Sequence, residues 1–474
     1  MSRVDQRPPS TGAPTLVGAD MQVPLVSGET RPYVNLDYAA STPPHTSVAR
    51  AVEEFLPWYS SVHRGAGFKS QVATAAYEGA RNAARRFVGA REDDAVIFVR
   101  NTTDATNLLA SALPAGTRVL AFAVEHHANM LPWRRRGIEV TYLPVPASAA
   151  DALERLESAL RIGHAGERLV AVTGASNVTG EIWPQREIVE LAHRYGARVL
   201  LDGAQLAAHY PLDVAGLDID YLAVSGHKLY APFGAGLLVG RPDWLFAEAP
   251  YLRGGGAVDF VSLDSVLWSP LPDRQEAGSP NVVGAVALGV ACNDLGGYGM
   301  RSLADDEMAL ARYARDRLSR VPGLTLYRLW PEESPRLAIA AFNVGDYWHS
   351  HLAAILSAEY GIGVRHGCFC AHPLMIHLLG VSDAGAAEIR SGIARGEKAV
   401  VPGAVRASMG LGTSRADIDY LCDALASIVA DGPRWTYRRD PDTGEFVPDP
   451  DPRPMPRLAA ELLTSTQPHG GESS

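Results

Sequence analysis

The chain has 474 residues, 47% of them hydrophobic, so it is long enough to bury a large core and to form more than one domain. The net charge is −10 and there is no sustained basic block, so we expect no nucleic-acid partner and no anionic membrane surface. No apolar stretch has the length of a signal peptide or a membrane span, which predicts a cytoplasmic protein, and four cysteines are too few for a disulfide framework.

Residues 1–31 are rich in Pro, Gly, Ser and Thr and are predicted to form a flexible N-terminal arm. Over residues 32–290, continuous apolar runs alternate with helical patterns. The runs begin near residues 95, 118, 168, 198, 220 and 234. This pattern predicts a large α/β domain with a mostly parallel sheet covered by helices, whose first residues pack on a second domain. Ligands of such sheets bind beyond the carboxyl ends of the strands.

Residues 291–432 follow a different pattern: a long charged helix near residue 300, the strand-like "RLAIAAFNV", a cysteine segment, "VRASMGLG" and a closing helix. We predict a smaller α+β domain that carries the cysteines. Residues 433–474 form a Pro- and Asp-rich tail, for which we expect a hairpin around Asp-Thr-Gly and then a short helix, "RLAAELL".

Two charged residues end neighbouring apolar strands of the large domain. Lys228 follows "YLAVSGH" and Asp202 ends "RVLLD". A lysine in an apolar setting must find an anion, reach water or become neutral and nucleophilic, and a buried carboxylate needs a cation or strong donors. A pyridinium ring bound to the lysine through an imine satisfies both groups, so together they indicate pyridoxal phosphate.

Many segments in the same order resemble the class V aminotransferase family of fold-type I pyridoxal-phosphate enzymes, and within it the cysteine desulfurases with a short catalytic-cysteine loop. The segments are "VNLDYAASTPP", "HRGAG", "VRNTTDATNLLA", "EHHANMLPWR", "SNVTGEIWP", "LDGAQ", "SGHKLYAPFGAG", "EAGSPN", "RHGCFCAHPLM" and "VRAS". The resemblance covers roughly residues 33–429 and implies a fold-type I transferase with a large and a small domain.

The resemblance assigns the cofactor contacts by position. Lys228 would form the imine link, Asp202 would pair with the ring nitrogen and His126 would stack on the ring. The remaining cofactor-binding residues would be Gln205 and Asn177 near the phenolic oxygen, and Thr102, Thr103, Ser225, His227 and Ser279 around the phosphate. Taken alone, His126 also fits a strand-end histidine, and Thr102 and Thr103 also fit a helix N-cap.

The same resemblance implies how substrate binds and how the chain assembles. Arg365 and Arg406 would clamp the substrate carboxylate, a task suited to the planar guanidinium, and Ala39, Ala40 and His63 would also contact substrate. Ser279 would reach the site of the other subunit, so we expect a homodimer with shared sites. A serine stands where the family commonly has threonine.

The segment "RHGCFCAHP" has three interpretations. Cys370 fits the position of the catalytic cysteine, with Cys368 as an additional residue, and Arg365, His366 and His372 supply nearby positive charge. Alternatively, His366, Cys368, Cys370 and His372 alternate with period two and have the right chemistry for zinc, although neighbours on one strand face lie about 6.5–7 Å apart, too far to surround one ion. Structural, buried cysteines are the third possibility. We predict no metal site.

The predicted function is that of a pyridoxal-phosphate-dependent cysteine desulfurase, which converts L-cysteine to L-alanine with a persulfide on Cys370. A sulfur-acceptor protein is the expected partner. The segment of residues 378–405 is longer than the corresponding segment of the short-loop desulfurases usually is. A C–S lyase that performs β-elimination, or a selenocysteine lyase, therefore remains an alternative, and a cofactor-free scaffold is a third hypothesis.

Overall fold

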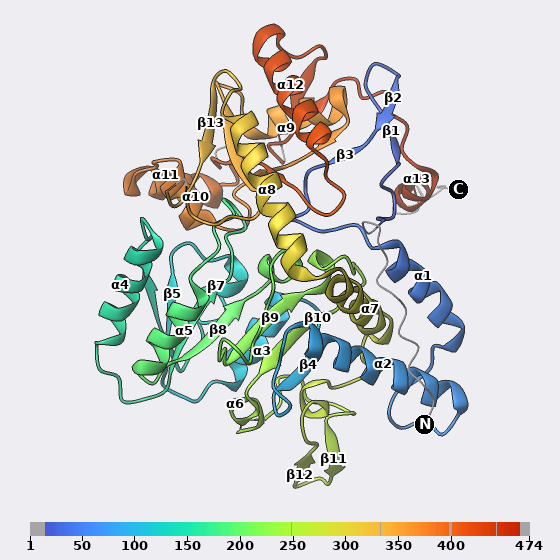
Figure 1. The fold of residues 1–474 in the computed structure, drawn as a ribbon, viewed down its shortest axis with the longest axis vertical. Helices are drawn as coiled ribbons and strands as arrows, with labels where there is room; N and C mark the ends of the chain where they lie inside the picture. The colour runs from blue at the N-terminus through green and yellow to red at the C-terminus, as the bar shows by residue number, and fades with distance from the viewer. Residues whose placement is uncertain (1–14, 248, 332, 398–400, 442, 465–474) are drawn as a thin grey trace, which may run out of the picture.

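The structure is a computed structural model that describes residues 15–464 apart from 248, 332, 398–400 and 442. A larger unit is built around a seven-stranded sheet, and a smaller unit built around a four-stranded sheet lies beside it (Figure 1).

The central sheet confirms the predicted α/β class. Its strands lie in the order β4-β10-β9-β8-β7-β5-β6, and β10 is antiparallel to both of its neighbours while β5 to β9 run parallel. The bounds are β4 Ala95–Val99, β5 Thr117–Phe122, β6 Ile138–Leu143, β7 Arg168–Thr173, β8 Arg198–Asp202, β9 Tyr221–Ser225 and β10 Gly236–Gly240. All six runs identified in the sequence are strands. The sequence analysis missed β6, an edge strand whose half-buried residues alternate with polar ones.

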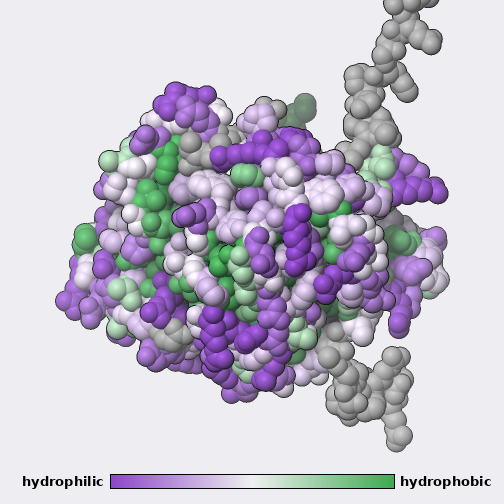
Figure 2. All heavy atoms as spheres, turned by 90° about the horizontal axis from the view of Figure 1, so that it is seen from above, coloured by the Kyte–Doolittle hydropathy of each residue, from purple (hydrophilic) through white to green (hydrophobic). Residues whose placement is uncertain are grey.

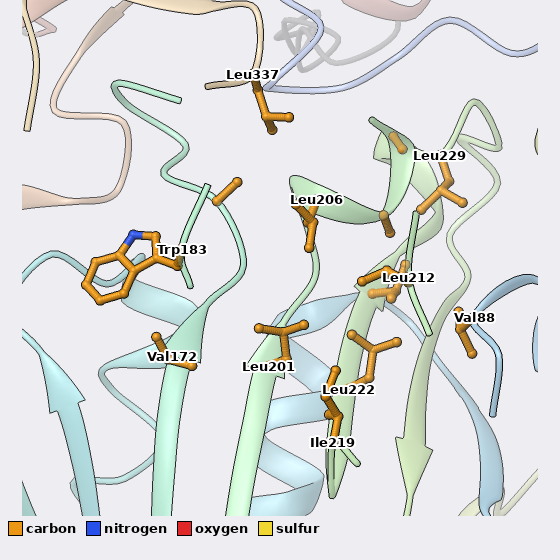
Figure 3. Packing of buried hydrophobic residues seen from close by; sticks show 14 of the residues in the cluster. Val88, Val172, Trp183, Leu201, Leu206, Leu212, Ile219, Leu222, Leu229 and Leu337 are labelled. Atoms are coloured by element: carbon orange, nitrogen blue, oxygen red, sulfur yellow. The ribbon is translucent and has the colours of Figure 1, made fainter. Parts of the chain in front are cut away.

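Helices cover both faces of this sheet. On one face, α3 (Thr102–Ala112) and α6 (Pro242–Ala247) pack on strand residues such as Ala121 and Leu200. On the other, Val172, Leu201 and Leu222 from adjacent strands contribute to a common apolar layer (Figure 3). The helices on that side are α4 (Ala149–Leu160), α5 (Gln185–Arg194) and α7 (Val282–Tyr298). Because α7 is apolar all round, it is buried, and α1 (Thr46–Phe55) and α2 (Phe68–Phe87) pack against it.

The smaller unit has an antiparallel sheet in the order β13-β14-β17-β16. The strands are β13 Leu324–Tyr327, β14 Ile339–Val344, β16 Arg365–Gly367 and β17 Ala404–Ser408. The helices that share its core are α8 (Met300–Leu318), α9 (His349–Tyr360) and α12 (Arg415–Asp431), so the predicted long charged helix and closing helix are confirmed. A capping box between Ser414 and Asp417 sets the start of α12.

Segments from both ends of the chain pack on the smaller unit. Strands β1 (Gln22–Pro24) and β2 (Thr30–Pro32) form a hairpin, Leu25 and Val26 beside it are buried, and β3 (Val34–Asn35) pairs in parallel with β15 (Ile362–Gly363). Residues 15–31, where the sequence suggested a loose arm, therefore contain ordered pairing, and residues 1–14 lie outside the described residues. The predicted tail hairpin is confirmed as β18 (Tyr437–Arg439) with β19 (Phe446–Pro448), and the predicted helix as α13 (Arg457–Thr464).

The remaining elements are short. A hairpin of β11 (Val258–Val261) and β12 (Val266–Trp268) projects from the larger unit (Figure 1). Two helices follow the cysteines, α10 (His372–Leu378) and α11 (Asp383–Ala394). The 3₁₀ turns are Leu56–Trp58, His127–Asn129, Leu206–Ala208, Gly226–Lys228 and Asp273–Gln275.

Hydrophilic side chains cover most of the face drawn in Figure 2, with smaller apolar areas between them. In the described part of the chain, no single helix is long and apolar enough to cross a membrane. Helices α7 and α8 meet that criterion only as a pair, and they are bent by 79° relative to each other.

Gly236 in β10 permits a close approach that brings α3 to the sheet. A β-carbon at this position would lie 2.6 Å from the Val224 carbonyl oxygen and 2.9 Å from the Asn101 Cα. We expect Gly236→Ala to destabilise the protein by about 1–3 kcal/mol and to lower the melting temperature by several degrees, because backbone atoms must move. Gly79→Ala is the control, since a β-carbon there meets nothing within 4 Å on an exposed helix position. Equal melting temperatures for the two variants would contradict this account.

Candidate active site

A cavity of about 330 Å³ opens where strands β7, β8 and β9 end, as expected for a doubly covered parallel sheet. The cysteine segment of the smaller unit forms part of its wall. The lining residues are Ala39, Ala40, Ser41, Asn101, Thr102, Thr103, His126, Ala128, Thr173, Ala175, Asn177, Asp202, Ala204, Gln205, Ser225, His227, Lys228, Arg365, Phe369, Cys370 and Arg406.

All of the predicted site residues line this cavity except His63 and Ser279. Those two are exposed and share a separate depression with Glu276 and Gly278. The His63 ring lies 3.0 Å from a Glu78 oxygen. Within one chain, these two residues are therefore not part of the Lys228 cavity.

Lys228 and Asp202 interact electrostatically across the cavity. Asp202 is the last residue of β8, and Lys228 ends the 3₁₀ turn after β9. Burial lowers the pKa of Lys228 to about 8, and the Asp202 carboxylate opposes that shift. Burial also raises the pKa of Asp202, opposed by the hydrogen bond from Ala204 N to Oδ1 (2.9 Å) and by the charge of Lys228. Near neutral pH, on the order of one Lys228 amine in ten is therefore uncharged and nucleophilic.

Two amides lie beside this pair. Gln205 donates from Nε2 to the Ala39 carbonyl oxygen (2.8 Å), while its Oε1 is buried without a hydrogen-bond partner among the described residues. Asn177 donates from Nδ2 to the carbonyl oxygen of Phe369 (2.8 Å). Gln205 therefore retains hydrogen-bonding capacity at the cavity wall, whereas Asn177 links the sheet to the cysteine segment.

The N-terminus of α3 faces the cavity with hydroxyl groups around it. The Ser225 hydroxyl accepts a hydrogen bond from Thr102 N (2.8 Å) and donates to Thr102 Oγ1 (2.9 Å). Asn101 caps the helix by accepting from Asp104 N, so neither Thr102 nor Thr103 is the N-cap. Backbone N–H groups and hydroxyls at a helix N-terminus bind anions such as phosphate.

His126 is held as a neutral ring. Its Nδ1 accepts a hydrogen bond from Ala128 N (3.0 Å), which places the proton of the neutral ring on Nε2. Burial lowers the pKa of His126 to about 3, helped by the positive charge of Lys228. A neutral aromatic ring at the wall of the cavity is suited to stacking on a planar cofactor.

Two arginines from the smaller unit line the cavity next to each other. Arg365 in β16 pairs directly with Arg406 in β17, an arrangement in which like charges repel. Arg406 is buried, donates to the Asn177 carbonyl oxygen (2.8 Å) and lies 3.3 Å from Asp37 Oδ1. Its Nε has no hydrogen-bond partner in the part of the chain that the structure describes. Burial lowers the pKa of Arg406 to about 10, and Asp37 opposes the shift. A carboxylate ligand between the two guanidinium groups would relieve this repulsion.

Cys370 lies on a tight turn at the rim of the cavity. The turn is closed by a hydrogen bond from Ala371 N to the Cys368 carbonyl oxygen (2.9 Å). Phe369 (φ 52°) and Cys370 (φ 55°) are both left-handed, a conformation that is strained for residues other than glycine. The Phe369 ring lies under the Arg406 guanidinium at 4.9 Å, so Arg406 also helps to hold the turn.

The histidines that flank the cysteines do not gather around one point. His372 Nδ1 lies 3.0 Å from His127 Nε2 with the rings stacked, and His127 N donates to the Cys370 carbonyl oxygen (2.8 Å). His366 instead pairs with Glu445. Among the described residues, no group of three or more His, Cys, Asp or Glu side chains is arranged to hold a metal ion.

The tail hairpin contacts the strand that carries Arg365. Glu445 Oε2 lies 3.0 Å from His366 Nε2, and Phe446 stacks on His351 of α9 with ring centroids 4.5 Å apart. At the base of the hairpin, Glu359 accepts hydrogen bonds from Trp435 N and the Tyr437 hydroxyl. The tail thus braces β16, one residue away from the proposed substrate arginine.

The sequence analysis missed several residues that organise the site. Asp37 stands in the segment "VNLDYAAS", and its acidic side chain could have been expected to pair with an arginine of the site. Asn101 directly precedes Thr-Thr, and the strong preference of asparagine for the N-cap could have identified it as the cap of the helix. His127 and Glu445 gave no such signal, because their partners His372 and His366 are distant in the chain.

The profile of the class V aminotransferases matches residues 34–421. A probable cysteine desulfurase from Halalkalibacterium halodurans is 39% identical over 354 residues, which cover 73% of this chain and 85% of that protein. A cysteine desulfurase from Cronobacter sakazakii is 39% identical over 73% of this chain and 86% of its own length.

Solved structures agree with these relatives. A cysteine desulfurase from Escherichia coli, in an S-sulfonic acid form, superposes with a TM-score of 0.71 at 32% identity, covering 84% of this chain and 95% of the other. An apo cysteine desulfurase from Thermococcus onnurineus gives a TM-score of 0.72 at 28% identity over the same fractions. The chain therefore belongs to the class V aminotransferase family of fold-type I enzymes. Within that family it belongs with the cysteine desulfurases.

The family profile ends at residue 421, so the brace from Glu445 lies outside the matched region. Burial lowers the pKa of His366, so near neutral pH its ring is mostly neutral and its contact with Glu445 is weaker than an ion pair. We expect Glu445→Gln to increase hydrogen–deuterium exchange of the peptide that contains β16, by up to about fivefold, because a partly exposed contact of this kind contributes up to about 1 kcal/mol. Exchange measured by mass spectrometry provides the test. Glu139→Gln, which removes the partner of Arg118 at the sheet edge, is the control. Unchanged exchange at β16 would contradict the bracing role.

Proposed function

We propose that the protein is a pyridoxal-phosphate-dependent cysteine desulfurase that removes sulfur from L-cysteine and leaves L-alanine. The observation that carries this proposal is the shared cavity: Lys228, Asp202 and Cys370 arrive from three separate segments and line the same space. The amine and the carboxylate suit a pyridinium cofactor, and the thiol suits sulfur transfer.

Enzymes of this family use pyridoxal 5'-phosphate, and the cavity fits that group. Its volume of about 330 Å³ lies in the range of small-molecule sites. Gln205 Oε1 is buried and unpartnered among the described residues, as expected of an atom beside a site for a polar ligand. Asp202 would hold the ring nitrogen, Lys228 the aldehyde carbon, and the α3 N-terminus with Thr102, Thr103, Ser225 and His227 the phosphate. When bound, the cofactor supplies an electron sink for charge that develops at the substrate α-carbon.

The protein residues divide the remaining tasks. Arg365 and Arg406 bind the substrate carboxylate and so orient the amino acid, and Lys228 removes the proton from its α-carbon. The Cys370 thiolate forms a bond to the substrate sulfur while the bond from that sulfur to the β-carbon breaks. The electron pair stays on the carbon, which is protonated to give alanine, and Cys370 holds the sulfur as a persulfide. Neutral His126 is positioned to carry a proton.

A homodimer is part of the proposal. His63 and Ser279 are exposed and lie in their own depression rather than in the Lys228 cavity. This position is consistent with both residues contributing to the active site of a second subunit. The separate position of Ser279 supports the proposal that its hydroxyl binds the phosphate of the cofactor in the other subunit.

The lowered pKa of Lys228 predicts how cofactor loading depends on pH. The attacking species is the neutral amine, which increases as pH rises through the pKa of about 8. We expect the rate of pyridoxal phosphate uptake by the apoprotein, followed by its visible absorbance, to rise about tenfold from pH 7 to 9 and then level off. A rate that is still rising tenfold per pH unit above pH 9 would indicate an ordinary lysine pKa. Lys228→Ala should abolish the covalent link.

Cys370→Ala tests the sulfur transfer. We expect this variant to keep the cofactor absorbance but to form alanine from cysteine at least about a hundredfold more slowly, because no other thiol lines the cavity within the described residues. Alanine and pyruvate are measured together by chromatography. Wild-type production of pyruvate and ammonia instead of alanine would identify a C–S lyase, and full desulfuration by the variant would contradict the role of Cys370.

A further inference from the structure

The turn that presents Cys370 also contains a second cysteine. Cys368 is the first residue of the turn and Cys370 the third, and the positive φ angles of Phe369 and Cys370 are typical of a type I′ turn. In an extended strand, residues two apart are separated by about 6.5–7 Å. The closed turn shortens that separation, and a disulfide needs Cα atoms about 4.4–6.8 Å apart.

The two thiols have different surroundings. Cys370 is exposed and lines the cavity, whereas Cys368 is half-buried against the apolar core below the turn and does not line the cavity. The backbone N–H of Cys370 donates toward the Cys368 sulfur, so that sulfur lies against the residue that carries the nucleophile. An outside acceptor reaches Cys370 from the cavity, but Cys368 approaches it from within the turn.

We propose that Cys368 is a resolving cysteine that converts the persulfide on Cys370 into free sulfide, a step that rests on the proposed desulfurase function. The Cys368 thiolate attacks the inner sulfur, which is Cys370 Sγ. A bond forms between the two Sγ atoms, the sulfur–sulfur bond of the persulfide breaks, and the terminal sulfur leaves with the electron pair as hydrosulfide. The two cysteines are oxidised to a disulfide, the transferred sulfur is reduced to sulfide, and the Cys368 proton goes to solvent.

The chemistry of thiol exchange favours this direction. Hydrosulfide is a stable, weakly basic leaving group, and low basicity of the leaving group accelerates exchange. Burial raises the pKa of the Cys368 thiol, so only a small fraction is thiolate at any time, which slows its reaction with outside oxidants while the persulfide next to it reacts with that fraction at close range. A low-molecular-weight or protein dithiol must then reduce the disulfide before the next turnover. The protein would thus release sulfide rather than hand a persulfide to a protein acceptor.

The experiment uses the holoenzyme, treated anaerobically with one equivalent of L-cysteine per site and no added reductant, so that no free thiol remains to reduce the product. In the wild type we expect one equivalent each of alanine and sulfide, with a 368–370 peptide about 2 Da lighter than the dithiol form. In Cys368→Ser and Cys368→Ala we expect a peptide about 32 Da heavier, as a Cys370 persulfide, and at least tenfold less sulfide. Cys422→Ala, at a buried cysteine in α12, is the control and should behave as the wild type.

The outcomes separate the two proposals. A persulfide in the wild type, with sulfide release equal to that of both Cys368 variants, overturns the resolving role and leaves the desulfurase function standing. Absence of alanine from the wild type overturns the desulfurase function and this step with it. Sulfide release restored in Cys368→Ser by an added dithiol supports the assignment, because the outside thiol then replaces the missing one.

Discussion

The electrostatic pair of Lys228 and Asp202 is the constraint on which the site depends. Both groups lie in a cavity at the carboxyl ends of β8 and β9. There, loss of water disfavours the charged form of each group, and the opposite charge of its partner favours that form again in part. A partly neutral amine suits an electrophilic group of a ligand, and a buried carboxylate suits a cationic one. The parallel sheet supplies the geometry, because its strand ends converge on one edge.

The cysteine turn is the second constraint. Its left-handed residues persist because distant parts of the chain hold them: Asn177 donates to the Phe369 carbonyl, His127 N–H to the Cys370 carbonyl, and Arg406 covers the Phe369 ring. The thiol therefore belongs to the smaller unit by sequence but is positioned by both units: Asn177 and His127 belong to the larger one and Arg406 to the smaller one. The tail adds a further contact through Glu445 and His366, beyond the region shared with the family.

Sequence reasoning worked best where chemistry follows from local pattern. Continuous apolar runs marked the strands, and the residues after them, Asp202 and Lys228, could be expected at one edge. It worked less well where the pattern was mixed, as in the edge strand β6, and where several residues compete for one role, as at the α3 cap, where Asn101 rather than a threonine accepts the hydrogen bond. Only the three-dimensional arrangement separates His63 from the other candidates, whereas Ser279 was already expected at the site of a second subunit.

By itself, the sequence determined the fold class, the order of the main elements and the membership of the cysteine desulfurase group. Apolar periodicity and ordered motifs are properties of short stretches of chain, so they can be recognised from the order of the residues alone. The tertiary structure alone decided which groups share a cavity and which tautomer His126 adopts. It also decided how Arg406 and His127 support the cysteine turn, how Asp37 pairs with Arg406 and how Glu445 contacts β16. Those properties depend on contacts between residues far apart in the chain and on the desolvation that burial imposes. Neither can be predicted from a short segment of the sequence.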